Sequence, residues 1–145
     1  MTEPYQTPCI SARLRLATRK ANGIYDEALK PYGINIAQFS LIRAIQRLDQ
    51  PTLNNLAAET QLDASTLGRN VRVLEKLGLV RSEPGRDKRT RVHSLTDRGL
   101  VTSREARENW KQVQKRLKTN LGPEGYETLF RLLDALEPDR TGLDV

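Results

Sequence analysis

Two groups of residues in this sequence have the chemistry to bind a polyanion. The stretch RDKRTRVH, from Arg86 to His93, places four basic side chains within six residues, with one acid, Asp87, among them. Arginine and asparagine side chains also form the bidentate hydrogen bonds that distinguish guanine and adenine in a major groove. Side chains of these two types also occur earlier in the sequence, at Arg69, Asn70 and Arg72, and two small hydroxyl residues, Ser65 and Thr66, precede them.

Periodic apolar residues predict the elements that position these groups. Steps of three and four residues indicate helices, whereas alternation with β-branched residues indicates strands. Helices are predicted from residue 10 to near Pro31, over 36–48, from a Thr52 cap to Thr60, and over 64–77 after an Asp63 cap, with Gly78 just past the end. Two short strands at 79–82 and 90–95 flank Pro84 and Gly85; Thr96 then caps a long helix, and Pro123 starts a last one.

The two helices around Gln61 have the spacing of a helix-turn-helix, whose second helix enters a major groove about 12 Å wide. Taken alone, that helix is also consistent with an ordinary amphipathic helix, because the polar face of such a helix is usually solvated. The basic hairpin directly after it favours a winged helix-turn-helix. The predicted fold is therefore mostly α with a small β hairpin, completed by helices from both chain ends.

The acid within the basic run gives the hairpin a specific interpretation. A wing reaches the neighbouring minor groove, where negative potential favours an inserted arginine. A carboxylate two residues away, Asp87, can orient the Arg89 guanidinium and reduce the entropy lost on binding. We therefore predict that Arg89 is the inserted side chain and Asp87 its brace, with Arg86, Lys88 and Arg91 as further contacts. The alternative is a solvated basic loop.

Bulk composition agrees with this interpretation. The chain has 145 residues, the size of one domain, and a formal net charge of +6, which attracts polyanions. Cys9 is the only cysteine, so an intramolecular disulfide or a thiolate metal cluster is excluded. The first residues lack the pattern of a signal peptide and no apolar run is long enough to span a membrane, which predicts a cytoplasmic protein.

Several motifs together resemble the MarR-type transcriptional regulators. They are STLGRNVRVLEKLGLV at 65–80, the D-x-R motif Asp87-Lys88-Arg89, SLTDRG at 94–99 and YDEALKPYGINIAQFSLI at 25–42. The resemblance spans about residues 10–136. Gln61 departs from the pattern, because helix-turn-helix proteins often have glycine there.

The resemblance implies a homodimer that binds double-stranded DNA. In such a dimer the first, fifth and sixth helices interlock, so residues 10–34 and 97–137 are the predicted dimerisation helices. Residues 36–96 form the winged helix-turn-helix, within a single MarR-type domain over 1–145. Two recognition helices related by a two-fold axis imply a roughly palindromic operator, with half-sites about one helical turn apart.

The resemblance also implies a repressor that a small aromatic or phenolic acid releases from its operator. The effector cleft would lie between the dimerisation helices and the winged domain, with Arg13, Tyr25 and Phe39 as candidate lining residues. The alternative is a peroxide sensor that acts through Cys9, at the start of the first helix, where unpaired backbone N–H groups favour a thiolate. The spacing from Cys9 to Gly33 does not match that expected of such sensors.

An enzyme and a protein-interaction module are the competing classes. The sequence has one cysteine and one histidine in different predicted elements, no glycine-rich phosphate loop and no metal-ligand spacing. We therefore predict no catalytic site, metal or cofactor, and interpret His93 as an ordinary strand residue. An interaction module would explain the apolar chain ends but not a braced basic hairpin. Steep salt dependence of duplex binding separates these classes, because phosphate contacts release counterions.

Overall fold

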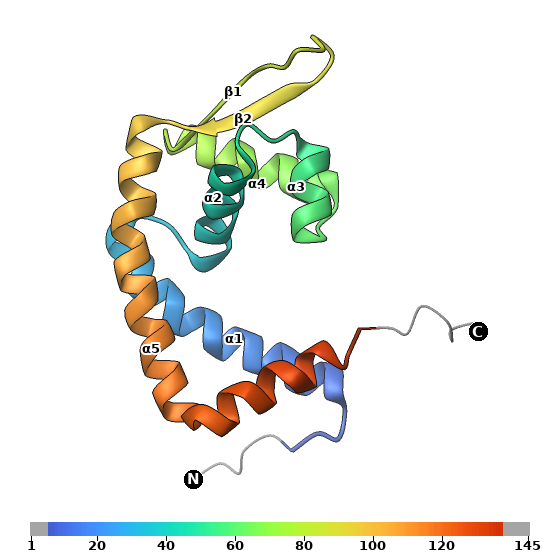
Figure 1. Cartoon of the computed structure of the whole chain (residues 1–145), viewed down its shortest axis with the longest axis vertical. Helices are drawn as coiled ribbons and strands as arrows, with labels where there is room; N and C mark the ends of the chain where they lie inside the picture. Colours follow the sequence, from blue (N-terminus) through green and yellow to red (C-terminus); the bar gives the residue numbers. More distant parts are fainter. Residues whose placement is uncertain (1–5, 138–145) are drawn as a thin grey trace, which may run out of the picture. The chain divides into compact units, whose positions relative to one another are not determined.

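The computed structural model describes residues 6–137 (Figure 1). The elements follow in the order α1 (Ile10–Leu29), η1 (Lys30–Tyr32), α2 (Ile36–Leu48), α3 (Leu53–Thr60), α4 (Ala64–Lys76), β1 (Val80–Pro84), β2 (Arg91–Leu95) and α5 (Asp97–Asp134). This confirms the predicted class, mostly helical with one small antiparallel hairpin. The residues divide by their contacts into two units, one ending at Trp110 and one beginning at Lys111.

Side-chain caps fix where the helix-turn-helix elements begin, at the two residues predicted. The Thr52 hydroxyl accepts the Asn55 backbone N–H at 3.2 Å, and the Asn55 side chain accepts the Thr52 N–H at 2.9 Å. Asp63 caps α4 by accepting the Thr66 N–H at 2.8 Å. Each cap satisfies a donor that the first helical turn would otherwise leave unpaired.

The turn between α3 and α4 requires a left-handed residue, and Gln61 adopts that conformation with φ 57°. Its N–H donates to the Ala57 carbonyl at 2.9 Å, which closes α3. Glycine reaches this region without the steric cost of a Cβ atom, which explains its frequency at such turns. Gln61 therefore completes the turn at a modest backbone cost.

The core of the first unit is built around α2. Phe39, Ile42 and Ile45 on α2 are almost completely buried, and α3 and α4 pack against them with the apolar residues Leu56, Leu67, Val71 and Leu74. Burying a side chain of this size contributes about 1.5–3 kcal/mol. The opposite, polar face of α4 is consequently presented outward.

The wing (residues 80–95: β1, β2 and the turn between them) is tied to the start of α5. Ser82 pairs with His93 in the antiparallel register. The Thr96 hydroxyl accepts the Gly99 N–H at 3.0 Å and donates to the Gly78 carbonyl at 2.6 Å. A Cβ atom at Gly99 would lie 2.0 Å from the Leu79 carbonyl oxygen, so only glycine allows this close approach. The SLTDRG motif thus joins the wing to α5.

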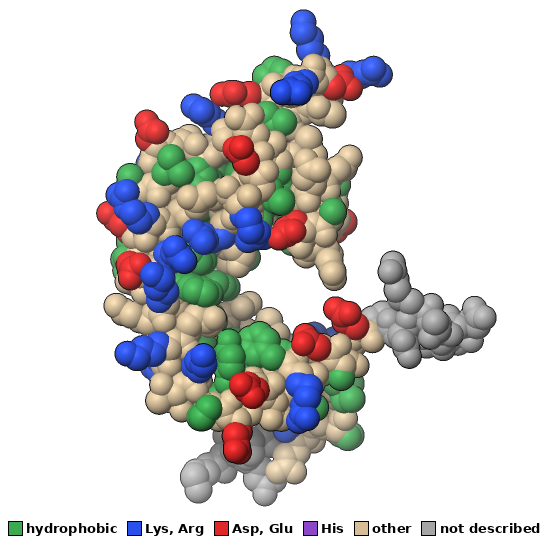
Figure 2. All heavy atoms as spheres, viewed as in Figure 1, with side chains coloured by type: hydrophobic (Ala, Val, Ile, Leu, Met, Phe, Trp, Pro, Cys, Tyr) green, Lys and Arg blue, Asp and Glu red, His purple; other side chains and the backbone are tan. Residues whose placement is uncertain are grey.

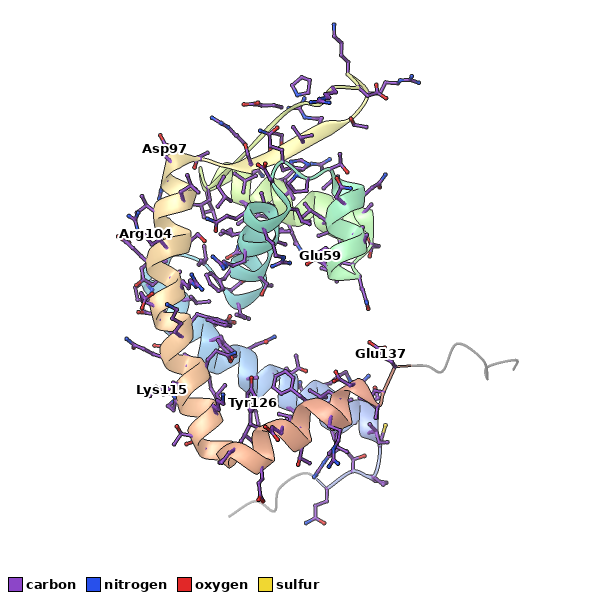
Figure 3. The ribbon with its side chains drawn as sticks, viewed as in Figure 1. Glu59, Asp97, Arg104, Lys115, Tyr126 and Glu137 are labelled. Atoms are coloured by element: carbon purple, nitrogen blue, oxygen red, sulfur yellow. The ribbon has the colours of Figure 1, made fainter. Side chains whose placement is uncertain are left out.

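Exposed apolar side chains are most frequent in the second unit, and others lie at the start of α1, on and beside α4 and at the start of α5. Ile10 at the start of α1 is 65% exposed, and in the second unit Leu129, Phe130 and Leu133 are also exposed. The second unit bends at Gly122, whose φ of 74° and ψ of 163° are non-helical, and Pro123 starts the following helical segment as predicted. Tyr126, labelled in Figure 3, lies in that segment with its ring centroid 4.8 Å from that of Phe130.

Candidate nucleic-acid interface

The N-terminal turn of α4 presents Ser65 and Thr66, both of which hydrogen-bond to the Asp63 cap. The Ser65 hydroxyl donates to Asp63 Oδ1 at 2.5 Å and the Thr66 hydroxyl to Oδ2 at 2.8 Å. Hydrogen bonds from the Ser65 hydroxyl and from the Thr66 N–H and hydroxyl hold the pKa of Asp63 well below its usual range. Both hydroxyl hydrogens are thereby engaged, which leaves the two oxygens able to accept from a base amino group.

The remaining predicted residues of α4 have different surroundings. Arg69 is exposed, whereas Asn70 is half-buried and lines a cavity towards α2. Arg72 is exposed and faces the wing side of the helix, where it lines a groove. The structure therefore separates the three residues that the sequence placed together on one polar face.

The wing tip carries the basic run, and Figure 2 shows Lys and Arg side chains gathered at the end of the hairpin. Asp87 Oδ1 lies 3.5 Å from Arg89 Nε and accepts the Arg89 backbone N–H at 3.1 Å. The Arg89 side chain is nevertheless 92% exposed, so it is oriented without being buried. Arg91 is instead held to β1, because its guanidinium donates to the Ser82 carbonyl at 2.9 Å.

A groove of about 440 Å³ lies between α3, α4 and the wing, and we refer to it as the wing groove. Arg72 from α4 and Arg89 and Arg91 from the wing line it together, so the fold brings members of both predicted groups to one concave surface. Thr52, the N-cap of α3, and Asn54 of α3 line the same groove. Neither residue is among the DNA contacts predicted from the sequence, although a capped helix start beside the wing is a signal that could indicate them.

His93 belongs to strand β2 of the wing, as predicted, but its surroundings are unusual. Its side chain is almost fully buried, and Nδ1 lies 2.8 Å from the Ser82 hydroxyl oxygen. That hydroxyl also hydrogen-bonds to the Glu75 carboxylate on α4. Within residues 6–137, Nε2 is buried without a hydrogen-bond partner. Burial lowers the pKa of His93 below its usual value; Glu75 opposes this shift and Arg91 adds to it.

A second cavity, of about 630 Å³, is lined by residues of α2, α3, α4 and α5, and we call it the arginine cleft. Its cations are Arg43, Arg47 and Arg107, and its aromatic wall is Phe39 and Trp110, whose ring centroids are 6.2 Å apart. Burial, then the positive charges of Arg107 and Arg47, lower the pKa of Arg43. A cavity with this charge and wall is suited to an anion that carries a flat apolar ring.

Only one acidic residue of the described chain lines the arginine cleft. It is Glu59, labelled at the end of α3 in Figure 3, and its carboxylate pairs with Arg47. Arg43 and Arg107 have no such acid beside them among the lining residues of the described chain. These two guanidinium groups are therefore the ones that an incoming anion would meet.

The predicted effector residues do not all lie at the arginine cleft. Phe39 lines it, but Arg13 lines a different cavity near the start of α1, together with Ile10 and Leu14. Tyr25 is half-buried on α1. No sequence pattern indicated Arg43, Arg107 or Trp110, because residues distant along the chain meet at this cleft only in the fold.

Cys9 is exposed and precedes the first residue of α1, as predicted for the N-terminal end of that helix. No helix among residues 6–137 is both long and apolar enough to cross a membrane. The same residues contain no cluster of three or more His, Cys, Asp or Glu side chains able to hold a metal ion.

Comparison with known proteins finds similar transcriptional regulators. A family model described as MarR family matches residues 32–90. The chain is 25% identical over 108 residues to the HTH-type transcriptional regulator YwoH of Bacillus subtilis (strain 168), covering 74% of this chain and 71% of YwoH. The M. tuberculosis transcriptional regulator MOSR, solved in complex with DNA, is 32% identical with a TM-score of 0.76, over 88% of this chain and 95% of that one.

A further solved structure shares the fold at lower identity. This structure is BpsR of Bordetella bronchiseptica, which was solved to explain how 6-hydroxynicotinic acid regulates its DNA binding. BpsR is 19% identical to this chain, with a TM-score of 0.81. The match covers 94% of this chain and 99% of that one. Together with the matched family model and the winged helix-turn-helix geometry, these likenesses show that the chain belongs to the MarR family of DNA-binding transcriptional regulators.

Proposed function

We propose that the chain is a homodimeric repressor that binds a palindromic operator through α4 and the wing. The main support for this DNA-binding surface is that Arg72, Arg89 and Arg91 line one groove between these elements. Cations along a concave surface bind the phosphate backbone, while Arg69 and the hydroxyls of Ser65 and Thr66 are positioned for base edges. Arg86 and Lys88 at the exposed tip add phosphate contacts.

The dimer is proposed from apolar residues that the single chain leaves exposed. Ile10 near one chain end and Leu129, Phe130 and Leu133 near the other are exposed in the described chain. Several exposed apolar residues within one short helical segment, as in the second unit, indicate an interface with another protein surface. We assign residues 10–34 and 97–137 to dimerisation and 36–96 to DNA binding, within one MarR-type domain.

A small aromatic or phenolic acid in the arginine cleft is the proposed effector. Its carboxylate would bind Arg43 and Arg107, and its ring would lie against Phe39 and Trp110, which wall the cleft. This chemical class is supported by BpsR, because 6-hydroxynicotinic acid regulates the DNA binding of that protein. Because Asn70 of α4 also lines the cleft, a ligand there is placed to shift the recognition helix. Ligand and operator would then weaken each other's binding reciprocally.

A peroxide sensor that acts through Cys9 is the second candidate, because this thiol is exposed at the start of α1. Its thiolate would attack a peroxide oxygen and the O–O bond would break, giving a sulfenic acid and a hydroxide (or alkoxide) that takes up a proton from solvent to become water (or an alcohol). The resulting change at the start of α1 would act on the dimer interface. Only peroxide, and no aromatic acid, would release the operator in this case.

Selection of bound sequences from a random pool of DNA duplexes tests the central proposal. The recovered sites should be palindromic, with half-sites about one helical turn apart, and binding should weaken steeply as salt rises. A panel of benzoic, salicylic and 6-hydroxynicotinic acids, with hydrogen peroxide as a separate arm, then identifies the releasing chemistry. Recovery of sequences with no common site and no salt dependence would reject the DNA-binding proposal.

A further inference from the structure

His93 links two elements of the DNA-binding surface through one hydroxyl group. Glu75 belongs to α4, Ser82 to β1 and His93 to β2, so the hydrogen-bonded chain Glu75–Ser82–His93 crosses from the recognition helix to both strands of the wing. The His93 backbone N–H also donates to the Pro51 carbonyl at 2.9 Å, which anchors β2 to the segment before α3. This chain is the only part of the wing's attachment that contains an imidazole, because the sequence has a single histidine.

The direction of the hydrogen bonds fixes the form of the imidazole. The Ser82 hydroxyl has one hydrogen, and a carboxylate only accepts, so this hydrogen is donated to Glu75. The hydroxyl oxygen must then accept from His93, whose Nδ1 therefore carries the proton. In the neutral ring Nε2 is consequently a bare lone pair, buried and unpartnered in the described structure.

Protonation would convert Nε2 from an acceptor into a charged donor. A buried N–H group without an acceptor is costly, and a buried charge costs more. The His93 side chain is only 5% exposed, so water cannot compensate while the wing stays in place. Movement of the wing away from α4 would let Nε2 meet water, but it would also break the link through Ser82.

The charged groups around the ring do not compensate for this cost. Glu75 on α4 favours the imidazolium and Arg91 on β2 opposes it, while burial outweighs both. Arg72 of α4 and Arg89 of the wing line the same groove as His93 and add positive charge, whereas Thr52 and Asn54 at the start of α3 are uncharged. The ionisable residues beside Ser82 on β1, Arg81 and Glu83, pair with each other at 3.4 Å, and those of α2, Arg43 and Arg47, line the arginine cleft.

We propose that the Glu75–Ser82–His93 chain positions the wing against α4, and that protonation of His93 releases it and weakens operator binding in acid. His93 is thus a positioning residue, since it acts through the wing and not by touching DNA. The proposal rests on the proposed DNA-binding surface. DNA phosphates near the wing would favour a positive charge on His93, but salt screens this attraction. The cost of the unpartnered Nε2–H is not screened, because this group lies in the protein interior.

The direction in which operator affinity changes with pH follows from the protonation state of His93 in the free protein and in the DNA complex. Above the ordinary histidine pKa of about 6.5 the ring is neutral and the link is intact, so affinity should be independent of pH. As pH falls below that value, the free protein with a displaced wing binds a proton more readily than the DNA complex. By linkage, operator affinity should then fall as the pH drops through the lowered pKa of His93, with the same midpoint as the titration of the imidazole.

The test follows the protonation of the His93 imidazole by NMR and measures operator affinity over the same pH range. The single Hε1 resonance reports the protonation of His93, and the amides of Gly85 and Thr90 report the position of the wing. We expect these amides to shift with the same midpoint as the imidazole. His93→Asn keeps a donor where Nδ1 lies and cannot titrate, so its operator affinity should lack the acid decline.

Two further variants keep the test independent of a folding defect in His93→Asn. Ser82→Ala should weaken operator binding at neutral pH and remove most of its pH dependence, because the link is already broken. Glu75→Gln should move the imidazole midpoint to lower pH, because it removes the charge that favours protonation. Circular dichroism establishes that each variant is folded.

The inference is overturned if wild type and His93→Asn show the same pH profile of affinity, or if the wing amides do not follow the imidazole. If wild type binds no duplex at any pH, the proposed function fails, and with it the operator part of this inference. The amide titration in the free protein would then still decide whether protonation moves the wing.

Discussion

The Asp87 carboxylate accepts the backbone N–H of Arg89 at 3.1 Å and lies 3.5 Å from Nε of the same residue. One acid therefore constrains both the turn and the direction of the arginine side chain. An ion pair this exposed contributes little to folding, because water and salt screen it. Its effect should appear when the arginine enters a groove and would otherwise lose its rotational freedom.

Arg89→Ala should weaken operator binding at every sequence and reduce the slope of log affinity against log salt by about one. Asp87→Ala should weaken binding less, because the arginine remains but is less constrained. Fluorescence anisotropy over a salt series measures both effects. Arg104→Ala, at an exposed position on α5 (Figure 3), is the charge-matched control. Affinity of Arg89→Ala equal to that of wild type would show that the basic run is a solvated loop.

Arg69→Ala should cost about 1–3 kcal/mol of operator binding and relax the preference at one base position. The reason is that Arg69 is exposed on α4, where a guanidinium can make a bidentate contact to guanine. Binding to operators substituted at each position in turn locates the effect. A uniform loss across all sequences would instead assign Arg69 to the phosphate backbone.

Gly99→Ala should destabilise the fold, because its Cβ would meet the Leu79 carbonyl oxygen at 2.0 Å. Overpacking of this kind costs about 1–3 kcal/mol or more, and here backbone must move. Gly125→Ala is the matched control, since its nearest neighbour would be a Leu121 side-chain atom at 3.6 Å. Removing a glycine from a helix should make that variant slightly more stable. Urea denaturation measures both, and equal midpoints would contradict the prediction.

Leu129→Asp should abolish dimerisation and operator binding together. An aspartate at a proposed apolar interface would be a buried and unpaired charge, which association cannot compensate. Sedimentation velocity at micromolar concentration measures the oligomeric state, and Glu127→Gln in the same segment is the control. A folded wild-type monomer under these conditions would contradict the proposed dimer.

The parts of the fold that local chemistry determines could be predicted from the sequence. Thr52, Asp63 and Thr96 cap the helices as predicted, because a cap depends on residues within one turn. The start of the last helical segment at Pro123 could also be predicted, because proline is tolerated at the start of a helix but not in its interior. Interactions between distant segments were not predictable in this way.

The arginine cleft and the surroundings of His93 show what the sequence could not reveal. Arg43 and Arg107 belong to different helices, and only packing places their like charges close enough to affect the pKa of Arg43. The sequence predicts His93 only as an ordinary strand residue, because alternation indicates its strand but not its hydrogen-bond partners. Ser82 and Glu75 reach it through strand pairing and through the packing of α4 on β1, which are tertiary events.

The effector prediction depends on two arginines that differ in one respect. Arg104 and Arg107 are both exposed on α5, but only Arg107 lines the arginine cleft. Arg107→Ala should therefore raise the concentration of aromatic acid needed to release the operator by roughly tenfold, the loss of one charge-assisted contact. Arg104→Ala should respond as wild type does.

Cys9→Ser separates this mechanism from the sensing of peroxide. A serine cannot form a sulfenic acid, so the variant should be insensitive if the thiol is the sensor. If aromatic acid releases wild type and Cys9→Ser equally, the cleft is the effector site and the exposed thiol is not required. Release of wild type by peroxide but not of Cys9→Ser, with no response of either to any acid, would instead assign sensing to the start of α1. Operator release followed by anisotropy, with Arg107→Ala beside Cys9→Ser, gives opposite patterns for the two mechanisms.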